Sequence, residues 1–287
     1  MKNNPTTICS LILFAIVMTT TWIGSVARAE EPPLKVFVFA GTSNLAGLGA
    51  NVTELPDDLK GQQKDVLVWQ DGAWTPLVPG KAPAKPGKMF GPEVTFGQAM
   101  TKHLGEPIGI ITGGLGQFAV IDHPEIYAGL VNKVKAAQKS RPIVIAGLLI
   151  QAGERDGVTE ALANAFPKNL TNFIDRVRKD FGTPAMPIVV NLAIPNTTMA
   201  PFVDVVRKAE LSAKLPGFAV ADCDDVQRGG DKIHYTTKGE IEFGKYFATA
   251  MIDLLKADKM QPTGTTAPNA SANKHQPKTA LKNQEVQ

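Results

Sequence analysis

Short runs of apolar, mostly β-branched residues recur along this chain, and a longer amphipathic segment lies between each run and the next. The runs are 34–40, 107–113, 143–150 and 187–194, with a weaker fifth at 218–223. Runs that are apolar at nearly every position suit strands buried on both faces of a parallel sheet. We therefore expect five strands at these positions.

The segments between these runs have the apolar spacing of helices. The expected helices are 94–104, 125–139, 161–181, 202–215 and 238–257, and Pro167 is expected to bend or restart the third. Strand and helix in alternation predict βαβ crossovers, and hence a three-layer α/β/α sandwich around a mainly parallel, flavodoxin-like sheet. The proline-rich stretch 51–92 is expected to be a long loop of the kind that often binds ligands.

The two ends of the chain differ in composition from its middle. Lys2, an apolar run at 8–18 and Ala27-Arg28-Ala29 predict a signal peptide cut after Ala29, and hence a secreted or periplasmic protein. An uncleaved anchor is the alternative, although the apolar run is short for a bilayer span. Residues 259–287 are poor in apolar residues, so we expect a disordered tail there. One domain, 30–258, remains, and we expect no stable membrane insertion of the mature chain.

Charge and cysteine content narrow the possible partners. Removing Lys2 and Arg28 lowers the net charge from +3 to +1, and removing the tail, with four lysines and one glutamate, leaves about −2. This near-neutral body argues against nucleic acid as a partner. Cys223 is the one cysteine after the predicted signal, so it has no intrachain disulfide partner, and we expect a small buried residue.

A serine follows the first predicted strand. In Gly41-Thr42-Ser43-Asn44, Ser43 lies at the carboxyl end of the strand, which is the edge where open α/β sheets bind ligands. At the start of a following helix, backbone N–H groups could stabilise an oxyanion beside it. The alternative is that Ser43 only caps that helix.

A histidine three residues after an aspartate precedes the last predicted helix. In Asp231-Lys232-Ile233-His234, the carboxylate can reach the imidazole Nδ1–H and leave Nε2 free to accept a proton from a serine hydroxyl. A capping box from Thr237 to Glu240 is predicted to start that helix. The other histidines are weaker candidates: His103 lies in a helical pattern, His123 in a turn and His275 in the tail.

These motifs, in this order, resemble the SGNH-hydrolase superfamily, and more narrowly its sialate O-acetylesterase and acetylxylan esterase group of carbohydrate esterases. The similar blocks, which span residues 34–255, are Gly41–Gly47, Trp74–Pro76, Phe90–Gly97, Gly113–Gly116 and Ile150–Asp156. The resemblance implies that an O-acetyl group on a sugar or polysaccharide is hydrolysed through an acyl-serine intermediate. No spacing of His, Cys and Asp suggests a metal site, and we expect no cofactor.

The resemblance also assigns roles to residues. It implies Ser43 as the nucleophile, His234 as the general base and acid, and Asp231 as the residue that orients His234. The backbone N–H groups of Ser43 and Gly116 would form two arms of the oxyanion hole.

The third arm is where this sequence departs from the group. Ala152 stands where the group has a glutamine, and Gln151 lies one place earlier, so it could replace that glutamine only if the strand end bulges. Asn44 and Glu154 would brace the site. The alternative for Glu154 is an ordinary ion pair with Arg155 or a lysine.

Other functions fit less well. A catalytically weakened, carbohydrate-binding member of the same fold is the main alternative, because the oxyanion block is altered. Gly114-x-Gly116-x-x-Ala119 fits a dinucleotide-binding pattern but lacks its acidic partner. The Gly-x-Ser-x-Gly pattern of the α/β-hydrolase nucleophile elbow is not matched, because Leu45 stands where the second glycine is required. Trp69 and Trp74 could stack on a sugar ring, or they could simply pack in a loop.

Overall fold

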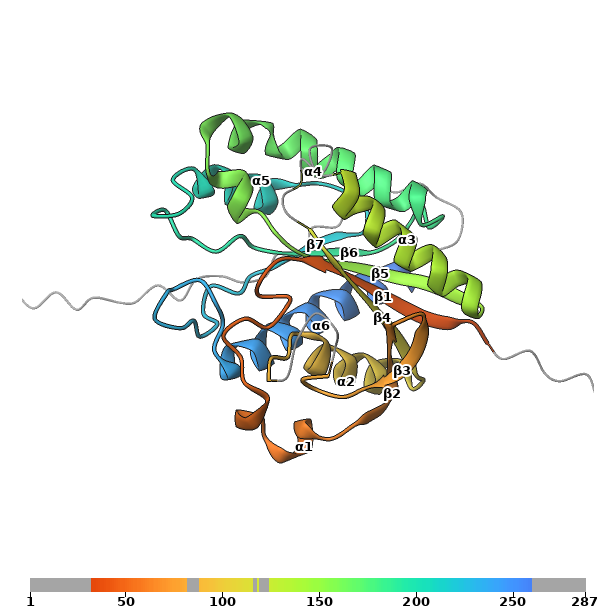
Figure 1. The fold of residues 1–287 in the computed structure, drawn as a ribbon. Helices are drawn as coiled ribbons and strands as arrows, with labels where there is room; N and C mark the ends of the chain where they lie inside the picture. Colours follow the sequence, from red (N-terminus) through yellow and green to blue (C-terminus); the bar gives the residue numbers. More distant parts are fainter. Residues whose placement is uncertain (1–31, 82–87, 116–117, 119–123, 260–287) are drawn as a thin grey trace, which may run out of the picture. The chain divides into compact units, whose positions relative to one another are not determined.

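The apolar run that begins at residue 34 forms β1 (Leu34–Gly41), which lies at the centre of the sheet (Figure 1). The computed structural model describes residues 32–81, 88–115, 118 and 124–259, and within them the sheet has seven strands in the order β3-β2-β4-β1-β5-β6-β7. The parallel strands are β1, β2 (Gln63–Gln70), β4 (Ile108–Gly114), β5 (Ile143–Gln151), β6 (Ile188–Asn191) and β7 (Phe218–Ala221). All five predicted strands are confirmed.

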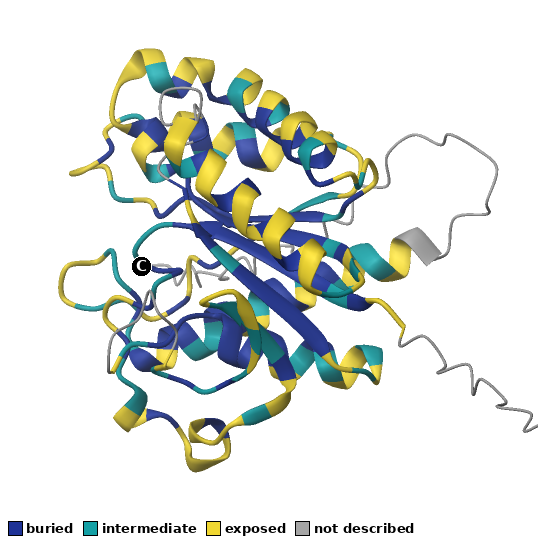
Figure 2. Cartoon of the chain, turned by 45° about the vertical axis from the view of Figure 1, so that its right-hand side comes forward, coloured by how far each residue is buried: buried dark blue, intermediate teal, exposed yellow. Residues whose placement is uncertain are grey.

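Both faces of the central strands are buried, which explains their continuous apolar runs. In β1, Val36 and Val38 face one core, while Phe37 and Phe39 face the other. The first core is covered by α3 (Pro124–Ser140), α4 (Glu160–Asp180) and α5 (Val203–Ser212), and the second by α2 (Glu93–Leu104) and α6 (Thr237–Lys259). Figures 1 and 2 show the buried strands between these two helix layers. The predicted three-layer α/β/α sandwich is confirmed.

The expectation of a long loop over 51–92 is wrong in part. This stretch contains a short 3-10 helix η1 (Val52–Glu54), α1 (Asp57–Lys60), β2 and the antiparallel edge strand β3 (Ala73–Leu77). Asp71 and Gly72 join β2 to β3 with φ of 49° and 80°, the positive values that a tight hairpin turn requires. Pro76 is tolerated because β3 is an edge strand.

The tryptophans of this hairpin are anchored in the fold. The rings of Trp69 and Trp74 meet edge to face with their centroids 5.2 Å apart, and both pack against the core under α3. The indole N–H of Trp74 donates to Ser140 Oγ at 3.1 Å. These contacts support the packing alternative for both residues.

Pro167 in α4 and Cys223 in the core were the subjects of two further expectations. The helix α4 runs through Pro167 without restarting, because its apolar stripe of Phe166, Leu170 and Phe173 stays buried across the proline. Cys223 is buried, as predicted. None of the helices in the described part of the chain is both long and apolar enough to cross a membrane. The predicted signal peptide and all of the predicted tail except Lys259 lie outside the described residues.

Candidate active site

The nucleophile candidate lies in a series of turns that follows β1. Residues 42–49 form turns in place of the expected helix, and the Leu48 N–H donates to the Ser43 carbonyl at 3.0 Å. Ser43 therefore caps no helix in this segment. Gly47 has a φ of 74°, and a Cβ there would lie 1.8 Å from the Phe90 carbonyl oxygen. The turn thus needs glycine at this position and is held against the start of the Phe90–Gly97 block.

The three residues that the sequence singled out for chemistry meet at the carboxyl edge of the sheet. His234 Nε2 lies 2.9 Å from Ser43 Oγ, and His234 Nδ1 lies 2.6 Å from Asp231 Oδ2. With Nδ1–H donating to the carboxylate, Nε2 is left to accept the serine proton. This is the geometry of a nucleophile activated by a base that a carboxylate orients.

The carboxylate of Asp231 is fixed from both sides. Its Oδ1 accepts the backbone N–H of Ile233 at 2.9 Å and that of His234 at 3.0 Å, while Oδ2 binds the imidazole. These bonds, that of Ile233 foremost, lower the pKa of Asp231 to about 2, because they stabilise the charged form. Its side chain is also 49 % exposed, so burial opposes the charge little and Asp231 stays ionised.

Asn44 connects the serine turn to the histidine loop. Its Nδ2 donates to the Ile233 carbonyl at 3.1 Å, and its Oδ1 accepts the Tyr235 N–H at 3.2 Å. The two bonds flank His234, and Asn44 itself is 1 % exposed. Asn44 therefore joins the chain on both sides of His234 to the serine turn.

Gln151, the last residue of β5, also binds the serine turn. Its Oε1 accepts the Thr42 N–H at 3.0 Å and the Thr42 hydroxyl at 2.7 Å, and its side chain also hydrogen bonds Glu154. Because both Gln151 Oε1 partners are donors, its amide nitrogen is the group left to bind Glu154. β5 does contain an irregularity, but it lies at Ala146, five residues before Gln151. Ala152 faces the apolar core under α4 and α5.

The acidic block after β5 joins the neighbouring loops. Glu154 Oε1 accepts the Ile194 N–H at 3.1 Å, so it binds backbone rather than forming an ion pair with Arg155. Burial raises the pKa of Glu154. Asp156, which sequence reasoning missed as a site residue, is fully buried and accepts the Phe118 N–H at 3.2 Å. Its place in the Ile150–Asp156 block was the available signal.

Gly116 and His123 lie outside the described residues; the Leu115 N–H donates to the Gly41 carbonyl at 2.8 Å, which places Leu115 at the end of β1. The helix α6 is capped by Thr236, whose Oγ1 accepts the Gly239 N–H at 3.2 Å. The predicted capping box is therefore wrong, because the Thr237 hydroxyl instead binds Glu54.

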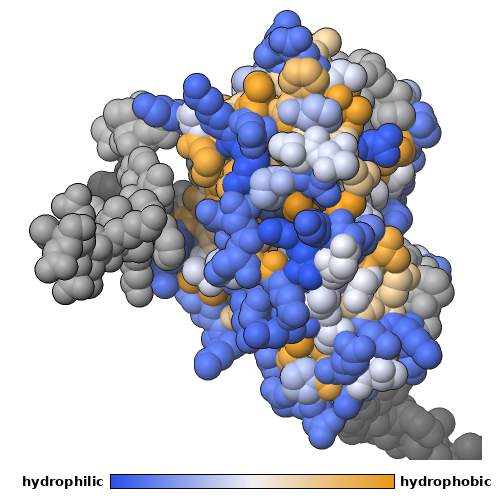
Figure 3. All heavy atoms as spheres, turned by 90° about the vertical axis from the view of Figure 1, so that its left-hand side faces the viewer, coloured by the Kyte–Doolittle hydropathy of each residue, from blue (hydrophilic) through white to orange (hydrophobic). Residues whose placement is uncertain are grey.

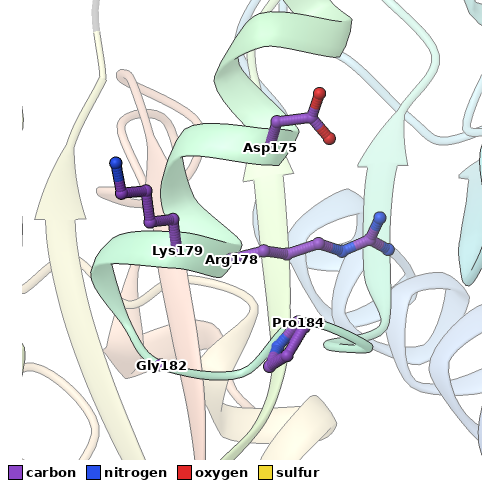
Figure 4. A pocket seen from close by; sticks show the side chains of 5 residues that line it. All are labelled: Asp175, Arg178, Lys179, Gly182 and Pro184. Atoms are coloured by element: carbon purple, nitrogen blue, oxygen red, sulfur yellow. The ribbon is translucent and has the colours of Figure 1, made fainter.

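A cavity of about 360 Å³ adjoins the histidine loop, between residues 194–198 and 228–232. Hydrophilic side chains predominate across the middle of the face that carries the loops after the strands (Figure 3). A larger hollow of about 510 Å³ lies at the end of α4, near the opposite edge of the sheet. There the Arg178 guanidinium binds the carbonyls of Met186 and Pro216, and the charged side chains point apart (Figure 4). That hollow gathers no catalytic groups.

Comparisons with known proteins agree with this architecture. A probable carbohydrate esterase of Arabidopsis thaliana is 24% identical over 257 residues, which are 80% of this chain and 97% of that protein. Its X-ray structure is similar with a TM-score of 0.67 at 21% identity, over 77% of this chain and 99% of that one. A carbohydrate acetylesterase from Xanthomonas citri has a TM-score of 0.55 at 16% identity, over 78% of this chain and 57% of that one.

The family assignment rests on a match over most of the chain. The model of the family described as carbohydrate esterase, sialic acid-specific acetylesterase matches residues 33–253. The match contains the serine turn, the Ile150–Asp156 block and the histidine loop. The chain therefore belongs to the carbohydrate esterase, sialic acid-specific acetylesterase family.

Proposed function

We propose that this protein is an exported serine esterase that removes O-acetyl groups from a sugar or polysaccharide. The observation that carries the proposal is the hydrogen-bonded row of Ser43, His234 and Asp231 at the carboxyl edge of the sheet. Membership of a carbohydrate esterase family supports an ester of a sugar as substrate. The signal-like residues 1–29 support export.

The proposed reaction has two halves that use the same groups. Ser43 Oγ attacks the acetyl carbonyl carbon while its proton passes to His234 Nε2, and Asp231 stabilises the imidazolium. Collapse of the tetrahedral intermediate breaks the bond to the sugar oxygen, which takes the proton from His234. Water then gives a proton to His234 and attacks acetyl-Ser43, and the second intermediate collapses by breaking the bond to Ser43 Oγ, which takes the proton back from His234 as acetic acid leaves.

The negative oxygen of the tetrahedral intermediate needs donors. We assign this role to the N–H groups of Ser43 and Gly116 and to the side-chain amide of Gln151. The carbonyl of Gln151 is already held by Thr42 and its nitrogen by Glu154, so the amide is fixed before substrate binds. A donor held in advance stabilises developing charge without reorganisation.

The alternative is a carbohydrate-binding member of the fold with weakened chemistry. The distances of 2.9 Å from His234 Nε2 to Ser43 Oγ and of 2.6 Å from His234 Nδ1 to Asp231 Oδ2 argue against this alternative. Packing alone does not require a serine, a histidine and an aspartate to be hydrogen bonded in a row. The test is acetate release by residues 30–287 from acetylated xylo-oligosaccharides, an O-acetylated sialic acid and an aryl acetate. Release that is lost in Ser43→Ala supports the proposal, and binding of sugars without any release supports the alternative.

The pH profile should show one protonation on its acid side. Asp231, with a pKa lowered to about 2 by its hydrogen bonds, stays ionised above about pH 3, so the carboxylate that orients His234 adds no second protonation above that pH. We expect log(kcat/KM) for an aryl acetate to fall with a slope of one as pH decreases. A slope of two between pH 4 and 6 would contradict this assignment.

Asn44→Ala should impair catalysis through the position of His234. The variant loses both bonds that flank His234, so we expect kcat to fall about tenfold to 100-fold with a smaller change in KM. Asn51→Ala, which removes two exposed hydrogen bonds from Thr53, is the matched control and should keep kcat. An Asn44→Ala enzyme that is fully folded by circular dichroism and fully active would show that this amide does not position His234.

A further inference from the structure

The cavity beside the histidine loop has a basic lining. Asn196, Thr197 and Thr198 line it from the loop after β6, and Arg228 and Lys232 line it from the loop that carries His234. No aspartate or glutamate is among the described residues that line it. A hollow with hydroxyl, amide and cationic groups next to a catalytic histidine suits a polar ligand that carries negative charge.

Lys232 has a backbone conformation that favours glycine. Its φ is 61°, and among the described non-glycine residues only Asp71, in the hairpin turn, is also positive. This conformation lets the chain reverse, with the Lys232 N–H donating to the Gly229 carbonyl at 2.9 Å, so that Asp231 binds the N–H groups of Ile233 and His234. Glycine would make the same reversal without steric cost. A side chain kept at such a position calls for a function of its own.

Neither cationic side chain of this loop forms an ion pair within the described residues. The Lys232 side chain is exposed and has no hydrogen-bond partner there. Arg228 donates through Nη2 to the Asp224 carbonyl, but its Nη1 is buried and has no partner among the described residues. The nearest carboxylate in the sequence, Asp231, is already bound by His234 and two backbone N–H groups. Positive charge at the cavity is thus left for a ligand.

We propose that Lys232 is a specificity-determining residue that binds a carboxylate on the sugar next to the acetylated position. This rests on the proposed esterase function and deepens it, because it selects acidic over neutral acetylated sugars. Lys232 lines the cavity two residues from His234, and its αL backbone fixes where its side chain leaves the chain. Arg228, which lines the same cavity, adds positive potential.

The experiment compares two substrates that differ only in charge. One is an O-acetylated methyl glucuronoside, and the other is the corresponding uronamide, in which a neutral amide replaces the carboxylate. The readout is the ratio of kcat/KM for the two substrates within each variant, which cancels any change in the common chemistry. For the wild type we expect a preference of about fivefold for the carboxylate at low ionic strength, and a smaller one at high salt, since exposed charge pairs are weak and screened.

The variants separate the ammonium from the strained backbone. Lys232→Met and Lys232→Gly should both bring the ratio to about one, Lys232→Arg should keep the preference, and Lys232→Glu should reverse it. Lys245→Met makes the same charge change on an exposed part of α6 and should keep the wild-type ratio. A wild-type ratio of one, or a preference that survives Lys232→Met, would overturn the inference while leaving the esterase function standing. If the wild type hydrolyses neither these sugars nor an aryl acetate, the proposed function itself fails.

Discussion

Ser43→Ala is expected to lower kcat by about 10⁴-fold or more while leaving far-UV circular dichroism and the melting temperature nearly unchanged. The variant removes the atom that would form the bond to the acetyl group, and what remains are the oxyanion donors and substrate binding. Ser43 is part of a turn whose bonds are made by backbone groups, so its hydroxyl contributes little to folding. The measurement is aryl acetate hydrolysis under saturating substrate.

The control and a second variant sharpen this test. Ser212→Ala removes a hydroxyl at the end of α5, away from the site, and should keep full activity. His234→Ala should cost nearly as much as Ser43→Ala, and the double variant should be no worse than either, because the two groups act as one unit. Ser43→Ala activity within about tenfold of wild type would show that another group is the nucleophile.

Gln151→Ala is expected to lower kcat about 100-fold with little change in KM. The variant removes the proposed third donor to the oxyanion, which forms only after the ground state, and it also frees Thr42 beside the nucleophile. The measurement is kcat and KM for an aryl acetate, beside thermal unfolding. Gln63→Ala is the matched control. The Gln63 amide donates to the Val94 carbonyl, far from Ser43, so this variant should lower stability without lowering kcat.

Ala152→Gln tests the same assignment from the neighbouring position. Ala152 is 1 % exposed and faces the core under α4 and α5, so a glutamine there cannot reach the oxyanion and crowds apolar neighbours. We expect lower stability and no gain in kcat. A clear rise in kcat for Ala152→Gln, or an unchanged kcat for Gln151→Ala, would show that Gln151 is not the donor.

The sheet and the helices could be predicted because burial on both faces leaves continuous apolar runs. Phe37 and Val38, for example, face opposite sides of the sheet, and both sides are covered by helices, so both residues are apolar. Such a run without polar positions can be recognised directly in the sequence. The sequence pattern did not predict the hairpin of β2 and β3, because the many prolines in 51–92 favour a loop. Asp71-Gly72, with positive φ at both residues, is nevertheless a recognised turn signal. Proline in an edge strand costs no ladder bond.

The sequence predicted the candidate site only at residues that belong to a recognisable motif. Ser43, Asp231 and His234 follow from strand ends and spacing, but the helix expected after Ser43 is a set of turns fixed by distant contacts such as that of Gly47 with Phe90. The role of Asp156 depends on a loop 38 residues away in the chain. The cavity beside Lys232 depends on two loops that meet only in the folded protein. No local pattern encodes these tertiary contacts.

The most direct test of the central claim is covalent labelling by a fluorophosphonate, followed by mass spectrometry of the intact protein and of its peptides. The reagent reacts with serines that a neighbouring base activates. We expect one adduct per chain, located on Ser43, with no labelling of Ser43→Ala and strongly slowed labelling of His234→Ala. A wild-type protein that stays unlabelled, or that carries the adduct on a different residue, would contradict an activated Ser43.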